Sequence, residues 1–222
     1  MEKKTFKAYF HRLFPVRLLV PWIFLWKGAR ARLTTAHGWA RSLRHLEPVD
    51  EHGRPMPWLP YAVVRFLAER VRPDLSVLEL GAGYSTLWFA SAARRVVSVE
   101  HDAKWIAWLR ERLDGGAGVE VVATSRDSAD AYLAPVRGRG ELFDLVLVDG
   151  PFRNEAFREA LGMLTPAGVI VLDDSDRPAY APSFAEAARA GLRRLDFEGH
   201  KAATVNVYRT TVFYRDGNCL GI

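Results

Sequence analysis

Short apolar runs alternate with longer amphipathic stretches along most of the chain. The runs are rich in Val, Leu and Ile, which is typical of strands that are buried on both faces of a sheet. The pattern predicts strands at about residues 76–80, 95–100, 119–123, 143–148, 169–172, 194–197 and 211–214. Apolar positions at helical spacing predict helices at about 61–71, 105–113, 154–164 and 184–192. We therefore expect an α/β fold, a doubly wound Rossmann-like sheet of seven strands with helices on both faces and the last strand antiparallel.

A tight turn follows the first predicted strand. It reads Glu79-Leu80-Gly81-Ala82-Gly83 and leads into a helical stretch. The glycines permit torsions and a close ligand approach that a Cβ would block, and the helix N-terminus aims free N–H groups above the strand. A dinucleotide site requires a third glycine three residues after Gly83, where this chain has Thr86. The turn therefore favours a ligand other than a dinucleotide. An ordinary strand-to-helix turn without a ligand also explains its sequence.

Polar side chains follow the carboxyl end of each of the first five predicted strands. Because parallel strands place these ends at one edge of the sheet, we expect the side chains to form a site there. Glu100 follows Glu79 by about twenty residues, which is the usual position of a carboxylate that binds ribose hydroxyls. The segments are Glu79, Glu100-His101-Asp102, Thr124-Ser125-Arg126-Asp127, Asp149-Gly150-Pro151 and Asp173-Asp174.

Three of these segments resemble the motifs of class I S-adenosylmethionine-dependent methyltransferases, and the resemblance runs from about Pro57 to the C-terminus. They are Glu79-x-Gly81-x-Gly83, Val-Ser-Val-Glu100-His101-Asp102 and Leu-Val-Leu-Val-Asp149-Gly150-Pro151. The resemblance implies that S-adenosylmethionine is the cofactor, with its methionine part against the glycine turn and its ribose bound by Glu100. The residues implied to bind it are Glu79, Gly81, Ala82, Gly83, Tyr84, Ser85, Thr86, Glu100, His101, Ser125, Asp127 and Asp149.

Three carboxylates end the fourth and fifth predicted strands, namely Asp149, Asp173 and Asp174. Neighbouring carboxylates repel each other unless something neutralises them, and hard oxygen ligands in this number suit Mg²⁺. The layout resembles the metal-dependent catechol-type O-methyltransferases, although Asp174 stands where that family has Asn. The resemblance implies a metal site formed by the three aspartates. Without a metal, Asp149 would be the catalytic base or a hydrogen-bond acceptor, and a structural role for the group stays open.

The methyl acceptor is not identified by the sequence. An oxygen of a small molecule, a sugar or a glycolipid suits the acidic edge of the sheet. The segment Asp149-Gly150-Pro151-Phe152 also resembles the Asp-Pro-Pro-aromatic loop of amino-directed methyltransferases, which makes N-methylation, on nucleic acid among other acceptors, an alternative. The third alternative is a non-catalytic module that binds the cofactor.

Charge is distributed unevenly along the 222 residues. The formal net charge is +5, yet the segment before Glu47 contains ten Lys and Arg residues and a single acid, so the remainder is mildly acidic. An acidic body makes nucleic acid an unfavourable partner. The apolar stretch 13–26 is too short to span a bilayer, but with its basic flanks it suits the surface of an anionic membrane. Packing on the body or on a second subunit in a homo-oligomer is the alternative.

These patterns predict three segments. They are a basic amphipathic arm at residues 1–46, a Pro-rich linker at 47–60 and a methyltransferase domain at 61–222. Trp58 and Tyr61, near the start of that domain, either close over a substrate or pack in the core. The single Cys219 excludes an internal disulfide and suits a reducing compartment. We therefore expect a cytoplasmic protein that is peripheral at the inner membrane surface if the arm binds lipid.

Overall fold

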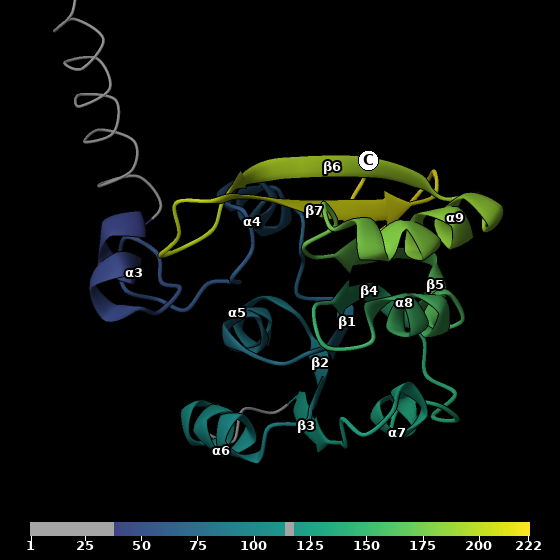
Figure 1. Ribbon diagram of the computed structural model, residues 1–222, viewed down its shortest axis with the longest axis horizontal. Coiled ribbons are helices and arrows are strands. Elements are labelled where there is room, and N and C mark those ends of the chain that lie inside the picture. Colours follow the sequence, from purple (N-terminus) through teal and green to yellow (C-terminus); the bar gives the residue numbers. More distant parts are fainter. Residues whose placement is uncertain (1–37, 114–117) are drawn as a thin grey trace, which may run out of the picture.

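The computed structural model describes residues 38–113 and 118–222. Its strands are β1 (Ser76–Leu80), β2 (Arg95–Glu100), β3 (Val119–Ala123), β4 (Phe143–Val148), β5 (Leu164–Leu172), β6 (Arg193–His200) and β7 (Val207–Tyr214). They form one sheet in the order β3-β2-β1-β4-β5-β7-β6 (Figure 1). The pairs among β1 to β5 are parallel, and β7 is antiparallel to both of its neighbours. The predicted sheet and its antiparallel last strand are confirmed.

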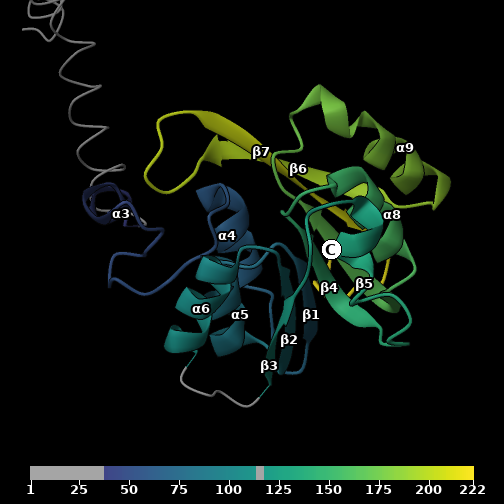
Figure 2. The ribbon, with the colours of Figure 1, turned by 60° about the horizontal axis from the view of Figure 1, so that its bottom comes forward.

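Helices cover both faces of this sheet, as the sequence predicts. They are α3 (Trp39–His45), α4 (Tyr61–Ala68), α5 (Tyr84–Ala92), α6 (Ala103–Arg112), α7 (Ala129–Leu133), α8 (Arg153–Leu161) and α9 (Ala181–Arg189), with a 3-10 turn, η1 (Pro178–Tyr180), before α9. Figure 2 shows α4, α5 and α6 on one side of the sheet and α8 and α9 on the other. The two layers give the inner strands β2, β1, β4 and β5 an apolar environment on both faces.

The alternation of side chains along the strands divides the core in two. In β1, Leu78 and Leu80 pack with the helices α7, α8 and α9, whereas Val77 packs with α4 and α5 on the opposite face. All three side chains are fully buried. Successive residues of a strand point to opposite faces, so a strand covered on both sides must be apolar throughout, which explains the unbroken apolar runs in the sequence.

Two parts of the predicted sheet differ from the structure. Strand β5 begins at Leu164 rather than near Val169, and its pairing with β4 shifts register between these two residues. A Cβ at Gly168 would lie 2.9 Å from the carbonyl oxygen of Phe143, so glycine allows this close approach. Strands β6 and β7 are longer than predicted because they form a continuous hairpin ladder whose outer residues are polar.

The segment before α4 packs against the body. The Val49 and Pro55 backbones form an isolated bridge, and Met56 and Leu59 are buried in the core. Residues 47–60, predicted as a linker, therefore contribute to the body, and the domain boundary stays a prediction. Most of the predicted arm, residues 1–37, lies outside the described residues, so membrane binding and oligomer formation through it also stay predictions. In the described ranges no helix is long and apolar enough to cross a membrane.

Candidate active site

Two backbone turns lie in close contact at the carboxyl edge of the sheet. Gly81, after β1, has a φ of 109°, and a Cβ on it would lie 2.5 Å from the nitrogen of Gly150, after β4. The backbone N–H groups of Asp149 and Gly150 both donate to the carbonyl oxygen of Leu80, at 3.0 and 2.5 Å. A Cβ on Gly150 would lie 2.3 Å from the hydroxyl oxygen of Tyr132. Glycine is therefore required in both turns.

Glu100 fastens the glycine turn to the end of β2. Its Oε2 accepts a hydrogen bond from the N–H of Ala82 at 3.2 Å, and its Oε1 accepts from the N–H groups of His101 and Asp102 at 2.8 and 2.9 Å. On the other side of the turn, Nε1 of Trp105 donates to the carbonyl oxygen of Ala82 at 2.8 Å. The central residue of the turn is thus held from β2 and from α6.

Glu79 lies beneath the turn. It is fully buried, and its Oε2 accepts a hydrogen bond from the hydroxyl of Ser98 at 2.5 Å. Burial raises the pKa of Glu79 to about 7, and the hydroxyls of Ser85, Ser98 and Thr86 oppose that rise. Glu79, one of the residues implied to bind the cofactor, therefore lies among the hydroxyls of β2 and α5.

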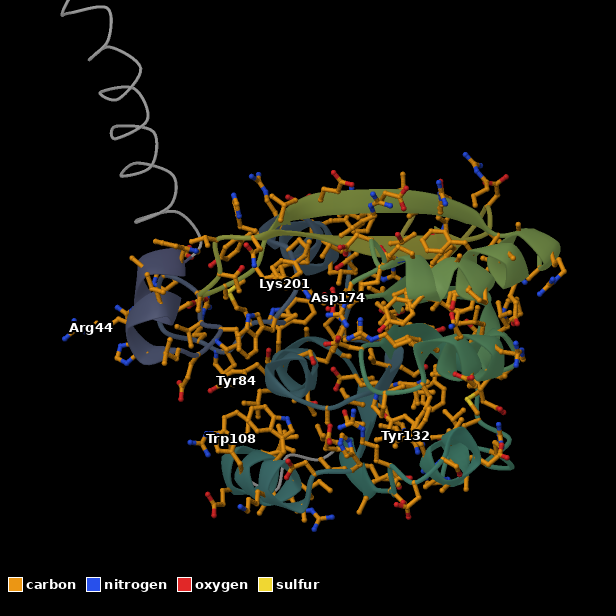
Figure 3. The ribbon with its side chains drawn as sticks, viewed as in Figure 1. Arg44, Tyr84, Trp108, Tyr132, Asp174 and Lys201 are labelled. Carbon is orange, nitrogen blue, oxygen red and sulfur yellow. The ribbon has the colours of Figure 1, made fainter. Side chains whose placement is uncertain are left out.

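The other residues at the start of α5 stabilise the helix end. The hydroxyl of Thr86 accepts a hydrogen bond from the N–H of Gly83 at 3.0 Å. Tyr84 is buried and its ring centroid lies 4.8 Å from that of Trp108 on α6; Figure 3 shows both side chains between these helices. These predicted cofactor-binding residues hold the helix whose N-terminus faces the turn.

A cavity of about 370 Å³ opens above the two turns, and we call it the glycine-turn cavity. It brings together residues from the ends of β1, β2 and β4, as the sequence predicts for a site at this edge. Its lining residues are Gly81, Ala82, Glu100, His101, Arg126, Asp149, Gly150, Pro151, Arg153, Arg177 and Tyr180.

The loop after β3 reaches the glycine-turn cavity through one residue of its predicted polar segment. Ser125 and Asp127 are hydrogen-bonded to each other, with Oγ donating to Oδ2 at 2.6 Å, and neither lines the glycine-turn cavity. Arg126, between them, lines it instead. Arg126 is thus the residue of this segment that lines the cavity. Ser125 and Asp127 bond to each other within the loop instead.

Three basic side chains neutralise the three aspartates, namely Arg153, Lys201 and Arg177, whose Nη2 lies 2.5 Å from Oδ2 of Asp174. Nη2 of Arg153 donates to Oδ1 of Asp149 at 2.7 Å, and Nη1 of the same arginine lies 3.2 Å from Oδ2 of Asp174. Nζ of Lys201 donates to Oδ2 of Asp173 at 2.5 Å and to Oδ1 of Asp174 at 2.7 Å. Burial raises the pKa of Asp174, but the hydrogen bond and charge of Lys201, with the arginine charges, lower it below its ordinary value overall.

The expected magnesium site does not fit this arrangement, and we correct that expectation. The ammonium of Lys201 bridges Asp173 and Asp174, while the remaining oxygen of Asp173 accepts from the hydroxyl of Thr210 at 2.6 Å. Within residues 38–113 and 118–222, no group of three or more His, Cys, Asp or Glu side chains is placed to hold a metal ion. Cationic side chains supply the neutralisation that the sequence suggested a metal would provide.

A second cavity, of about 260 Å³, is also lined by Asp149, and we call it the aspartate cavity. The Asp149 side chain is 32% exposed, against 2% for Asp173 and 8% for Asp174. Asp149 is therefore the accessible carboxylate of the three, and it lines both cavities. The lining residues of the aspartate cavity are Trp58, Asp149, Asp173, Asp174, Lys201, Thr204 and Tyr208.

The surroundings of Asp149 favour its protonated form more than water does. Burial among protein groups, followed by the charge of Asp173, raises the pKa of Asp149 well above its ordinary value, against the opposing charges of Arg153 and Lys201. A carboxylate with a raised pKa that remains accessible is suited to accepting a proton.

Some residues of the site are absent from the sequence-based set. Arg153 stands four residues after Asp149 at the start of a helix, a spacing that itself indicates an ion pair. Lys201 and Tyr208 belong to the β6–β7 hairpin, and no local motif connects either of them with Asp173 and Asp174, which lie 27 or more residues earlier. Trp58 was expected to close over a substrate or to pack, and it lines the aspartate cavity.

Residues 78–175 match a family described as a methyltransferase domain. Among solved structures, the O-methyltransferase TomG from Streptomyces achromogenes, involved in tomaymycin synthesis and in complex with SAM, is 26% identical with a TM-score of 0.54. That match covers 68% of this chain and 78% of TomG. No curated protein matches the sequence.

Two further structures share the fold. Cofactor-bound Rv0187 from MTB is 24% identical, with a TM-score of 0.51 and coverage of 68% of this chain and 75% of that one. The N-methyltransferase NodS from Bradyrhizobium japonicum WM9 is 17% identical, with a TM-score of 0.50 and coverage of 69% and 92%. The neighbours thus include both O- and N-methyltransferases.

Proposed function

The chain belongs to the class I S-adenosylmethionine-dependent methyltransferases, and on that premise we propose that it methylates an oxygen of a small-molecule, sugar or glycolipid-type acceptor. The observation that carries the proposal is that Asp149 lines both cavities. The glycine-turn cavity then takes the cofactor and the aspartate cavity takes the acceptor. The accessible carboxylate lies where the two ligands meet.

Residues of the glycine-turn cavity suit the cofactor. When bound, S-adenosylmethionine supplies an electrophilic methyl group on a sulfonium. Gly81 and Ala82 leave backbone within reach of the methionine part, and Glu100 ends β2 at the position of a ribose-binding carboxylate. Arg126 and His101 line the same cavity and would face the adenosine part.

Asp149 would act on the acceptor in the adjoining cavity. In the transfer, the acceptor oxygen would form a bond to the methyl carbon as the carbon–sulfur bond breaks, and the hydroxyl proton would pass to the carboxylate of Asp149. Arg153 fixes that carboxylate through its hydrogen bond to Oδ1 and through a second bond to the Asp149 carbonyl oxygen, at 2.7 and 2.8 Å. The base is therefore held in place before the acceptor enters.

Transfer of labelled methyl from S-adenosylmethionine into fractions of a cell extract tests the proposal. We expect wild-type protein to label an acceptor through a methyl ether, and we expect Asp149→Asn to abolish labelling while still binding S-adenosylhomocysteine. Asp130→Asn, at an exposed position away from both cavities, is the matched control. Labelling on nitrogen would favour the amino-directed alternative. Cofactor binding without any product would identify a non-catalytic module.

A further inference from the structure

Lys201 places a cation inside the aspartate cavity. It follows directly after β6, is 7% exposed and lines the cavity beside Asp173 and Asp174. Figure 3 shows the Lys201 and Asp174 side chains next to each other below the β6–β7 layer, in agreement with the 2.7 Å hydrogen bond between them. Charges of Asp173 and Asp149 raise the pKa of Lys201 although burial alone would lower it, so the side chain stays an ammonium.

Two tryptophans hold the loop that carries this lysine. Nε1 of Trp58 donates to the carbonyl oxygen of Ala202 at 2.8 Å, and Nε1 of Trp39 donates to the carbonyl oxygen of Thr204 at 2.9 Å. In Figure 1 the β6–β7 loop reaches across to α3. Side chains from distant parts of the chain, Trp39 and Trp58, therefore hold the loop that positions Lys201. Such support is expected for a residue that must bind a ligand in one orientation.

The ammonium of Lys201 has a donor left for a ligand. A lysine ammonium carries three N–H donors, and the two hydrogen bonds to Asp173 and Asp174 use two of them. The nitrogen also lies 4.7 Å from the ring centroid of Tyr208, which favours the charged form without consuming a donor. An acceptor oxygen in the cavity can take the third N–H.

The walls of the cavity combine aromatic faces with several polar groups. Trp58 and Tyr208 supply the aromatic faces, and the three aspartates, Lys201 and Thr204 supply acceptors and donors. A volume of about 260 Å³ suits one ring, because pockets for larger ligands occupy roughly 300–1,000 Å³. A ligand that matches these walls has flat apolar faces and hydroxyl groups around its edge.

Within the proposed function, on which this inference rests, we propose that the acceptor is a pyranose sugar positioned by Lys201. The sugar ring lies against Trp58 and Tyr208, the ammonium of Lys201 donates to one ring hydroxyl, and Asp149 takes the proton of a neighbouring hydroxyl that receives the methyl group. A phenolic ring is less suitable. Its apolar edge would remove water from the charged groups of the cavity without offering them hydrogen bonds.

Methyl transfer to defined probes tests this proposal. The probes are the methyl pyranosides of glucose, galactose and mannose, with catechol as the phenolic comparison. We expect wild-type protein to methylate at least one pyranoside and not catechol. We expect Lys201→Met to raise KM for that pyranoside at least tenfold, with a smaller change in kcat and an unchanged Kd for S-adenosylhomocysteine, and Lys201→Arg to recover part of the loss.

Several results would overturn the proposal. Methylation of catechol alone, no methylation of any pyranoside by wild-type protein that binds S-adenosylhomocysteine, or an unchanged KM in Lys201→Met would each do so. If Lys201→Met does not fold, Tyr208→Leu keeps every charge and removes one aromatic face; it should raise KM about fivefold, and an unchanged KM would again refute the idea. The underlying function fails separately, through loss of S-adenosylhomocysteine binding or methylation on nitrogen.

Discussion

The Cβ that any other residue would place at Gly81 would lie 2.5 Å from the backbone nitrogen of Gly150. This contact joins the turn after β1 to the turn after β4, and Asp149 immediately precedes it. Asp149, which lines both cavities, is therefore held next to a close backbone contact that only glycine permits.

Gly81→Ala should therefore disturb both stability and cofactor binding. Alanine is disfavoured at a φ of 109°, and its Cβ must displace backbone, so we expect a loss of about 2 kcal/mol or more in the free energy of unfolding. Urea unfolding and calorimetric titration with S-adenosylhomocysteine measure the two effects. Gly162→Ala is the control, because its φ is −81° and the nearest atom to a new Cβ is 3.6 Å away.

Trp105→Phe should weaken cofactor binding without unfolding the protein. The change removes the N–H that donates to the Ala82 carbonyl oxygen and keeps an aromatic ring against Trp108. A typical net hydrogen bond contributes about 1 kcal/mol, so the Kd for S-adenosylhomocysteine should rise roughly fivefold. Trp88→Phe, on the helix beyond the turn and lining neither cavity, should leave the Kd unchanged. Equal Kd values in the two variants would contradict a role for this hydrogen bond.

Glu79 should make the stability of the cofactor-free protein decrease with rising pH. Burial raises its pKa from 4.5 to about 7. Between these values the folded protein retains a proton that the unfolded chain has released, so the free energy of unfolding falls as pH rises through this window. The shift corresponds to about 3 kcal/mol at most. Urea unfolding between pH 4.5 and 7.5 measures the slope.

Glu79→Gln is the variant that isolates this effect. Glutamine has the same shape and can still accept from the Ser98 hydroxyl, but it does not titrate. The difference in unfolding free energy between wild type and variant should therefore grow in favour of the variant as pH rises. A difference that is constant across the range would show that Glu79 does not ionise with the proposed pKa.

The fold was predictable because its signals are local. The buried strands of the parallel sheet are continuous apolar runs, and the glycine turn has its own short motif, so β1 to β4 match the sequence-based ranges. Strands β6 and β7 were harder to predict because β6 is an edge strand with exposed polar residues. The two strands are stabilised by backbone pairing between residues on opposite sides of a loop. Amino-acid composition does not predict such pairing.

The site was predictable only at the ends of the strands. Glu100 and Asp149 could be placed at one edge of the sheet because parallel strands collect their carboxyl ends there, and both line the glycine-turn cavity. The partners of the aspartates could not be identified in the same way. Lys201 reaches Asp173 across 28 positions through the hairpin, so the sequence displayed three apparently uncompensated acids and suggested a metal. The compensating positive charge is that of Lys201, which follows β6.

Activity should not depend on a divalent metal. Since Lys201 and Arg153 already neutralise the aspartates, we expect wild-type turnover to be unchanged after dialysis against EDTA and unchanged on addition of Mg²⁺ or Mn²⁺. Methyl-transfer rates before and after chelation measure this. Loss of activity in EDTA that Mg²⁺ restores would show that an ion displaces Lys201 from Asp173 and Asp174 during turnover.

The rate of methyl transfer should follow the ionisation of Asp149. Burial and the charge of Asp173 raise the pKa of this carboxyl, and only its deprotonated form can take the acceptor proton. The rate under single-turnover conditions should therefore rise with pH through one ionisation, above the ordinary range of an aspartate, and then become constant. Asp149→Asn should lower kcat by roughly 10²–10⁴-fold and remove the pH dependence. A variant that keeps both its rate and its pH profile would show that transfer depends on proximity and orientation alone, without a base.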